Sequence, residues 1–149
     1  MRLLVVVLLA ACTRSNDVAA LRDEASAVAV FHQPVLDALV VRVHGLQRDL
    51  RTEYPGWPNM FRTAQLANDE LGLPPFEQTV PPGPAWRPGP TTLLGMGAYV
   101  RTRADELATH GRRDELKFLV TDERARYDRG IASVSEHLDQ VEHWLATSR

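Results

Sequence analysis

The sequence predicts an all-α protein, an elongated antiparallel helical bundle of two long helices and two short ones with a Pro-rich extended loop. Two observations predict the long helices: apolar residues recur in steps of three and four over residues 18–53, and again from 114 almost to the C-terminus. The third observation is that seven of the ten prolines fall within residues 73–90, where neither a regular helix nor a central strand can continue.

The first long helix is expected over residues 18–53. Asn16 or Asp17 is the predicted cap, because a short polar side chain can accept a hydrogen bond from a free N–H of the first turn. Pro34 lies inside the pattern and predicts a kink, since proline lacks the N–H donor and crowds the preceding turn. The apolar stripe consists of Val18, Leu21, Ala25, Val28, Phe31, Val35, Leu39, Val43, Leu46 and Leu50.

A short helix is expected after the break at residues 54–58. Asn59 is its predicted cap and Gly72 its C-terminal stop. The Pro-rich loop then covers residues 73–91, where Phe76 and Trp86 are expected to pack the extended chain. The apolar positions of this helix are Met60, Ala64, Ala67 and Leu71.

The second short helix begins after Thr91 or Thr92 and ends at His110-Gly111, with the glycine in the left-handed conformation. Its stripe is Leu93, Gly97, Val100, Ala104 and Leu107. Asp114 caps the last helix almost at once, so these two helices should form an antiparallel hairpin. The last helix carries Leu116, Val120, Tyr127, Ile131, Val134, Leu138, Val141 and Leu145.

The helix lengths predict a four-helix head above a two-helix neck, if the two long helices run in opposite directions. Both chain termini would then meet at the base of the neck. This register puts Pro34 and Gly130 at one height, which predicts a bend there unless a straight pair tolerates both residues. It also places Arg42 opposite Glu123, either as an ion pair or with each charge at a stripe edge and turned outward.

Composition limits the class of protein. The chain has 149 residues, enough for one domain with a sizeable core, and 17 basic against 19 acidic residues. A net charge of −2 argues against a nucleic-acid partner, which usually requires a basic face. The apolar run at the N-terminus is shorter than the ~20 residues that cross a bilayer, so the signal segment or a lipid must make any membrane link.

The N-terminus carries the most specific motif. Arg2 precedes an unbroken apolar run over residues 3–11, and this run leads into Leu9-Ala10-Ala11-Cys12. These residues resemble the lipobox of bacterial lipoprotein precursors, in which a cysteine directly follows small residues. Three alternatives stay open: cleavage nearby by ordinary signal peptidase, an uncleaved buried strand, and a chance match.

The resemblance implies a processing scheme and an address. Residues 1–11 would be a signal peptide, Cys12 the lipidation site and membrane anchor, residues 12–17 a tether, and residues 18–149 a single helical-bundle domain. Thr13, rather than an acid, follows the cysteine. By resemblance to known sorting behaviour, this favours the outer membrane if the source is Gram-negative, and the cell envelope in any case.

The sequence predicts no catalytic residue, cofactor or metal, and therefore no enzyme. It lacks Cys-x-x-Cys-His, His-Glu-x-x-His, Glu-x-x-His and Gly-x-Ser-x-Gly. Asp139 and His143 share a helix face and are a weak candidate for metal ligands. His32 and His137 could approach each other across the neck and hold a metal or haem, although two boundary histidines beside the seam are the commoner arrangement.

Four aromatic residues among the prolines are the candidate partner-binding residues: Tyr54, Trp57, Phe76 and Trp86. Rigid aromatics in loops often form binding surfaces, but they could instead cover the open side of the head. The leading hypothesis is a non-enzymatic, lipid-anchored envelope protein that binds another envelope protein and could dimerise through an exposed seam. The alternative is a helical bundle in the periplasm or at the cell surface that binds a small ligand, metal or haem.

Overall fold

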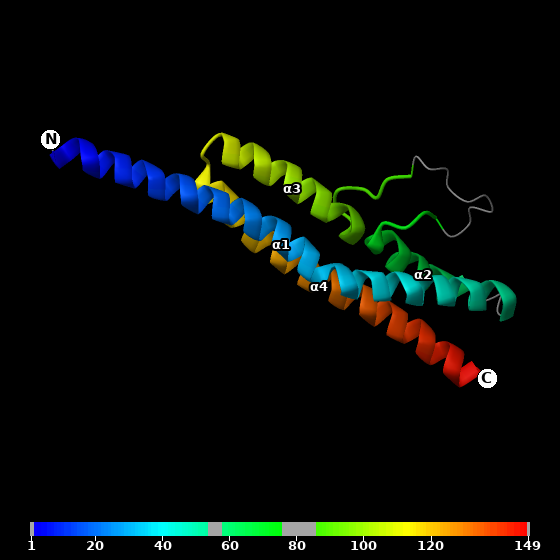
Figure 1. The fold of residues 1–149 in the computed structure, drawn as a ribbon. Helices are drawn as coiled ribbons and strands as arrows, with labels where there is room; N and C mark the ends of the chain where they lie inside the picture. Colours follow the sequence, from blue (N-terminus) through cyan, green and yellow to red (C-terminus); the bar gives the residue numbers. More distant parts are fainter. Residues whose placement is uncertain (1, 54–57, 76–85, 149) are drawn as a thin grey trace. The chain divides into compact units, whose positions relative to one another are not determined.

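The computed structural model describes residues 2–53, 58–75 and 86–148, with side chains from Asp17 onward except that of Glu53 (Figure 1). The four helices are α1 (Arg2–Glu53), α2 (Pro58–Leu71), α3 (Leu93–Thr109) and α4 (Arg113–Ser148). The described residues contain no strand. The predicted all-α fold with two long and two short helices is therefore confirmed.

Helix α1 begins far earlier than predicted. It starts at Arg2, so Asn16 and Asp17 lie inside the helix and do not cap it. The reason is local, because residues 2–33 contain neither glycine nor proline and many are good helix formers. Helices α1 and α4 also run unbroken through Pro34 and Gly130, so neither residue ends a helix, and the expected bend stays a prediction.

The predicted helix stops are confirmed. Gly72 and Gly111 have φ angles of 91° and 63°, the left-handed conformation that lets the next N–H reach back to an unpaired helix carbonyl. Thr92 caps α3, because its Oγ1 accepts a hydrogen bond from Gly95 N–H at 3.2 Å. The caps expected at Asn59 and Asp114 are wrong: α2 starts at Pro58 and α4 at Arg113, so both residues lie inside their helices.

The chain forms two compact units. Unit 1 comprises residues 1–31 and 97–126, and unit 2 comprises residues 32–96 and 127–149. Each unit contains part of both long helices. Unit 1 also contains most of α3, and unit 2 contains α2 together with the first turn of α3. The predicted head, which gathered both short helices in one half, is therefore wrong.

In unit 1, α1 and α4 lie side by side and run parallel (Figure 1). Asp17 of α1 pairs with Arg113 of α4, and Glu24, two turns later, pairs with Arg124, three turns later. Helix α3 is antiparallel to α4, as the short turn between them predicts. The core of this unit consists of Ala25, Val28, Val100, Ala104, Leu107, Leu116, Val120 and the buried acid Glu123.

In unit 2, the two long helices are also parallel. His32 Nε2 of α1 lies 3.8 Å from Asp128 Oδ1 of α4, and Arg42 Nη2 lies 2.8 Å from Asp139 Oδ1. The expectation that α1 and α4 run in opposite directions is wrong in both units. The core is formed by Leu36, Leu39, Val43, Leu46, Leu50, Met60, Ala64, Ala67, Leu71, Leu93, Met96, Tyr127, Val134, Leu138, Val141 and Leu145.

The buried stripe of α1 differs from the predicted one next to Pro34. Phe31 and Val35, both predicted to face the core, are 77% and 44% exposed, whereas His32 and Leu36 are buried. His32 can be buried in this core because its ring stacks on the aromatic ring of Tyr127. The apolar pattern alone favoured the two more hydrophobic neighbours, so the sequence placed the stripe one residue too early.

Candidate functional site

The predicted lipidation residue, Cys12, lies within α1, although its side chain is outside the described residues. The first described side chain of α1 is Asp17, five residues further along. At ~1.5 Å per residue, these two residues are separated by roughly 7–8 Å along the helix axis. The described side chains nearest to the motif along α1 are therefore those around Asp17.

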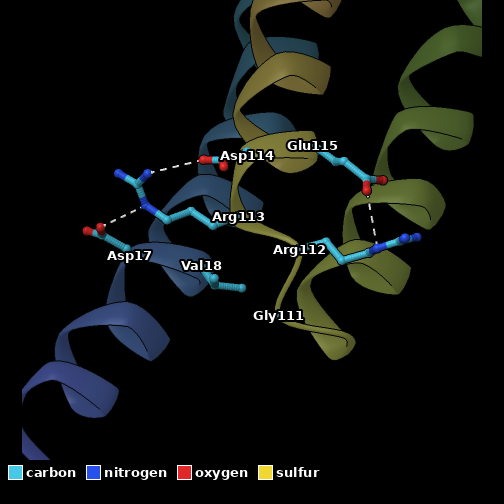
Figure 2. Close-up of a pocket in the computed structure, with 7 residues that line it drawn as sticks. All are labelled: Asp17, Val18, Gly111, Arg112, Arg113, Asp114 and Glu115. Carbon is cyan, nitrogen blue, oxygen red and sulfur yellow. Dashed lines mark hydrogen bonds and ion pairs between the residues drawn. The ribbon is translucent and has the colours of Figure 1, made fainter. Parts of the chain in front are cut away.

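An open cavity of about 620 Å³ lies between Asp17 and Val18 of α1 and the turn from α3 to α4 (Figure 2). The left-handed Gly111 forms this turn, and Arg112 N–H donates a hydrogen bond to the Leu107 carbonyl at 2.9 Å. The cavity is lined by Asp17, Val18, Gly111, Arg112, Arg113, Asp114 and Glu115.

Both arginines of this cavity are paired with carboxylates. Arg113 Nε lies 3.1 Å from Asp17 Oδ2 and its Nη1 lies 3.6 Å from Asp114 Oδ1, while Arg112 Nε lies 3.2 Å from Glu115 Oε1 (Figure 2). Three acids against two bases leave no surplus of positive charge. The lining contains no hydroxyl, thiol or imidazole group, and each of its three carboxylates lies beside an arginine, so its side chains offer ion pairing.

The two histidines proposed to face each other contact different groups. His32 is buried and stacks on Tyr127, with ring centroids 4.4 Å apart and planes 7° from parallel. His137 Nδ1 lies 3.5 Å from Glu70 Oε2, in a geometry that makes no hydrogen bond. His32 is thus held by aromatic packing, while His137 borders an acid of α2.

Asp139 and His143, the other suggested metal pair, have different surroundings. Asp139 accepts a hydrogen bond from Arg42 Nη2, whereas His143 is exposed. Arg42 also donates to both carboxylate oxygens of Glu142, at 3.0 Å each. The hydrogen bond with Glu142 raises the pKa of Arg42, and partial burial opposes that rise. Within the described residues, no three His, Cys, Asp or Glu side chains are placed to share a metal ion.

Arg42 and Glu123 do not form the expected pair, because Arg42 bonds to the acids of α4 just described. Glu123 does not turn outward either: it is 1% exposed, and neither carboxylate oxygen has a hydrogen-bond partner among the residues that the structure describes. Burial raises the pKa of Glu123 to about 7, while the charges of Arg124 and Arg126 act to lower it. The sequence signal for this buried acid was its position inside the apolar stripe of α4. Its burial itself depended on how the helices pack together.

Three of the four loop aromatics, Tyr54, Trp57 and Phe76, lie outside the described residues. The fourth, Trp86, is 40% exposed, and its indole Nε1 donates to the Gly72 carbonyl at 3.3 Å. Trp86 is therefore attached to the end of α2 while part of its ring stays accessible. That combination is compatible with both a covering role and a binding role.

Two polar clusters in unit 2 were missed by the sequence analysis. Ser133 Oγ donates to Glu70 Oε1 and lies 3.0 Å from its Oε2, so the hydroxyl is directed at an acid and not at a histidine base. Buried Asn68 accepts from Gln47 Nε2 at 3.0 Å and donates to the carbonyl of Pro74 at 3.0 Å. The partners Glu70 and Ser133 are 63 residues apart, so no local pattern indicates them.

The fold defines an all-α protein whose long N-terminal helix is rich in apolar residues. Residues 17–52 of α1 are long and apolar enough to cross a membrane, a property that signal sequences and core helices share. This helix is weakly compatible with an envelope location. Comparison of the chain with protein-family models, with curated proteins and with solved structures gave no significant match.

Proposed function

We propose that this chain is the precursor of a lipid-anchored cell-envelope protein with a structural or partner-binding role. The observation that carries the proposal is the order of Arg2, the apolar run over residues 3–11 and Leu9-Ala10-Ala11-Cys12. A thiol directly after two alanines and an apolar helix-forming segment is the arrangement that lipoprotein processing requires. The membrane partner is then the bilayer that holds the lipid of Cys12.

The role assigned to the mature chain is binding and not catalysis. In support, the charged side chains that line the cavity near Asp17 are paired with one another. The partner surface would include Trp86, which is anchored through one hydrogen bond and remains 40% exposed, together with Tyr54, Trp57 and Phe76 of the loops. The partner we propose is another envelope protein and not a nucleic acid.

The anchor is tested by replacing Cys12 with serine. We expect Cys12→Ser to abolish incorporation of a palmitate analogue and to leave the signal segment uncleaved, because serine offers no thiol for the diacylglyceryl group. The matched control is Ser15→Ala, which alters a polar residue three positions away and should keep both labelling and cleavage. Labelling of the Cys12→Ser chain would eliminate the lipoprotein proposal.

The binding role has a separate test. Crosslinking in the native envelope should capture a partner with the unaltered chain, and Trp57→Ala combined with Trp86→Ala should reduce capture, since truncated aromatic anchors commonly weaken interfaces. A chain that retains full capture after both substitutions would exclude the loop surface. Metal analysis and haem absorbance of the purified protein would, if positive, favour the ligand-binding alternative.

A further inference from the structure

Three polar side chains of unit 2 meet where α2 ends against α4: Glu70 of α2 with Ser133 and His137 of α4, which we call the α2–α4 cluster. Ser133 and His137 are one turn apart on α4, so both can face the same carboxylate. The shorter contact of Ser133 Oγ, at 2.8 Å, is with Glu70 Oε1. His137 Nδ1 lies 3.5 Å from the other oxygen, Oε2.

His137 Nδ1 is buried and has no hydrogen-bond partner among the described residues. Buried polar atoms are nearly always paired, so an unpaired one requires an explanation, and a bound ion is one of the usual ones. The neighbouring carboxylate oxygen carries only lone pairs when it is ionised. When the ring proton is on Nε2, Nδ1 also carries a lone pair, and two lone pairs directed into one gap are what a metal ion binds.

The separation of the two atoms matches that of neighbouring ligands on one metal ion. A tetrahedral ion with bonds of about 2.0–2.1 Å to nitrogen and oxygen holds those two atoms about 3.3–3.5 Å apart, and Glu70 Oε2 and His137 Nδ1 are 3.5 Å apart. Such an ion lies on the axis of the Nδ1 lone pair, about 35° to the side of the line between the two atoms. A pair of ligands is therefore poorly aligned for a hydrogen bond, as this pair is.

Charge at the end of α2 favours a cation. Asp69 and Glu70 both lie in the last turn of α2, where the helix dipole is negative, and this turn contains no basic residue. Asp69 accepts a hydrogen bond from the neutral amide of Gln65. Within the described part of the chain, Glu70 forms an ion pair with His137 and with no arginine or lysine; Arg129, two turns before His137 on α4, is exposed and does not reach it.

We propose that Glu70 Oε2 and His137 Nδ1 bind one divalent transition-metal ion of the zinc class, and that the Ser133 hydroxyl orients the carboxylate. A nitrogen and an oxygen ligand together suit Zn²⁺, whereas Mg²⁺ and Ca²⁺ take oxygen ligands. The Glu70 and His137 side chains are 40% and 27% exposed, so the ion can enter from solvent and water can complete its coordination. Two protein ligands make this an exchangeable site that joins α2 to α4, and it depends neither on lipidation nor on the loop surface.

Zinc binding by the full, untagged chain tests the site. The chain carries Cys12→Ser, because a thiol is itself a zinc ligand, and a mild detergent keeps residues 3–11 soluble. Equilibrium dialysis should show saturable binding of Zn²⁺. Glu70→Gln and His137→Gln, made singly, should each weaken it by at least about tenfold, since each removes one of the two protein ligands. His143→Gln, which alters an exposed histidine of the same helix, should bind Zn²⁺ like the unaltered chain.

The orienting role of Ser133 has its own variants. Ser133→Ala should weaken Zn²⁺ binding about tenfold, as the loss of a hydrogen bond to a metal ligand commonly does. Ser133→Thr keeps the hydroxyl and should restore the affinity, an outcome that a role in packing alone would not produce.

Nuclear magnetic resonance of the chain with ¹⁵N-labelled histidine identifies the ligand atom. Zn²⁺ should shift the Nδ1 resonance that is missing from the spectrum of the His137→Gln chain, and Mg²⁺ at the same concentration should leave it in place. The proposal would be overturned by the lack of saturable Zn²⁺ binding, by equal binding in the Glu70→Gln and His137→Gln chains, or by a shift confined to Nε2. An equal response to Mg²⁺ would overturn it as well.

Discussion

Glu123 is a residue whose ionised form is destabilised by the apolar core around it. Its carboxyl group is buried in the apolar core of unit 1 without a hydrogen-bond partner, and this burial raises its pKa to about 7 from the usual 4.5. Folding therefore favours the protonated form. Between these two values the folded chain binds more protons than the unfolded chain, so the free energy of unfolding falls as the pH rises from about 4.5 to about 7.

A glutamine at this position removes the cost of ionisation. We expect Glu123→Gln to raise the free energy of unfolding at pH 8 by about 2–3 kcal/mol and to change it little near pH 4, where both side chains are neutral. Urea denaturation at the two pH values measures the difference. Glu136→Gln, which alters an exposed acid of the same helix, should produce no such contrast. Equal effects of Glu123→Gln at both pH values would contradict the burial of a free carboxyl.

At the scale of the element, two glycines should respond to alanine in opposite ways. Gly95 lies in the first turn of α3, where an added Cβ would collide with the backbone carbonyl of Gly89. That carbonyl already accepts hydrogen bonds from the N–H and Oγ1 of Thr92, so it is not free to move. Gly45 is inside α1, and the nearest atom to its added Cβ is 4.0 Å away.

We therefore expect Gly95→Ala to destabilise the protein by about 1–3 kcal/mol, as overpacking does. Gly45→Ala should stabilise it by roughly 0.5–1 kcal/mol, because alanine loses less backbone entropy in a helix. Chemical denaturation of the two variants at the same low protein concentration gives both values. If Gly95→Ala were as stable as the unaltered chain, the close approach of residue 89 would not exist in solution.

At the scale of the whole molecule, the parallel direction of the long helices is the principal result. Two crosslinks between α1 and α4 within one unit determine their relative direction. Both crosslinks can form only if residue numbers increase in the same direction along the two helices. In the Cys12→Ser background, we expect disulfides in chains with Asp17→Cys and Arg113→Cys, and in chains with Glu24→Cys and Arg124→Cys. Mass spectrometry identifies the linked peptides. Failure of either pair to form above the level of Asp17→Cys with Arg124→Cys would contradict parallel packing.

The sequence by itself determined the local structure. It placed the stops at Gly72 and Gly111 and the cap at Thr92, all of which depend on residues within one or two turns. It also identified most of the buried stripes, except along α1 near Pro34, because helical periodicity repeats every few positions. The resemblance of residues 9–12 to a lipobox is likewise local, and for that reason it says nothing about what the rest of the chain binds.

Only the tertiary structure decided the direction of the long helices, the partners of Arg42 and the burial of Glu123. Short links fix the direction of neighbouring helices, but the Pro-rich segment between α2 and α3 is long enough to join them in either direction. The contacts between α1 and α4 join residues 96 to 100 positions apart. Such pairing depends on how three apolar stripes pack together, and no pattern within a single helix contains that information.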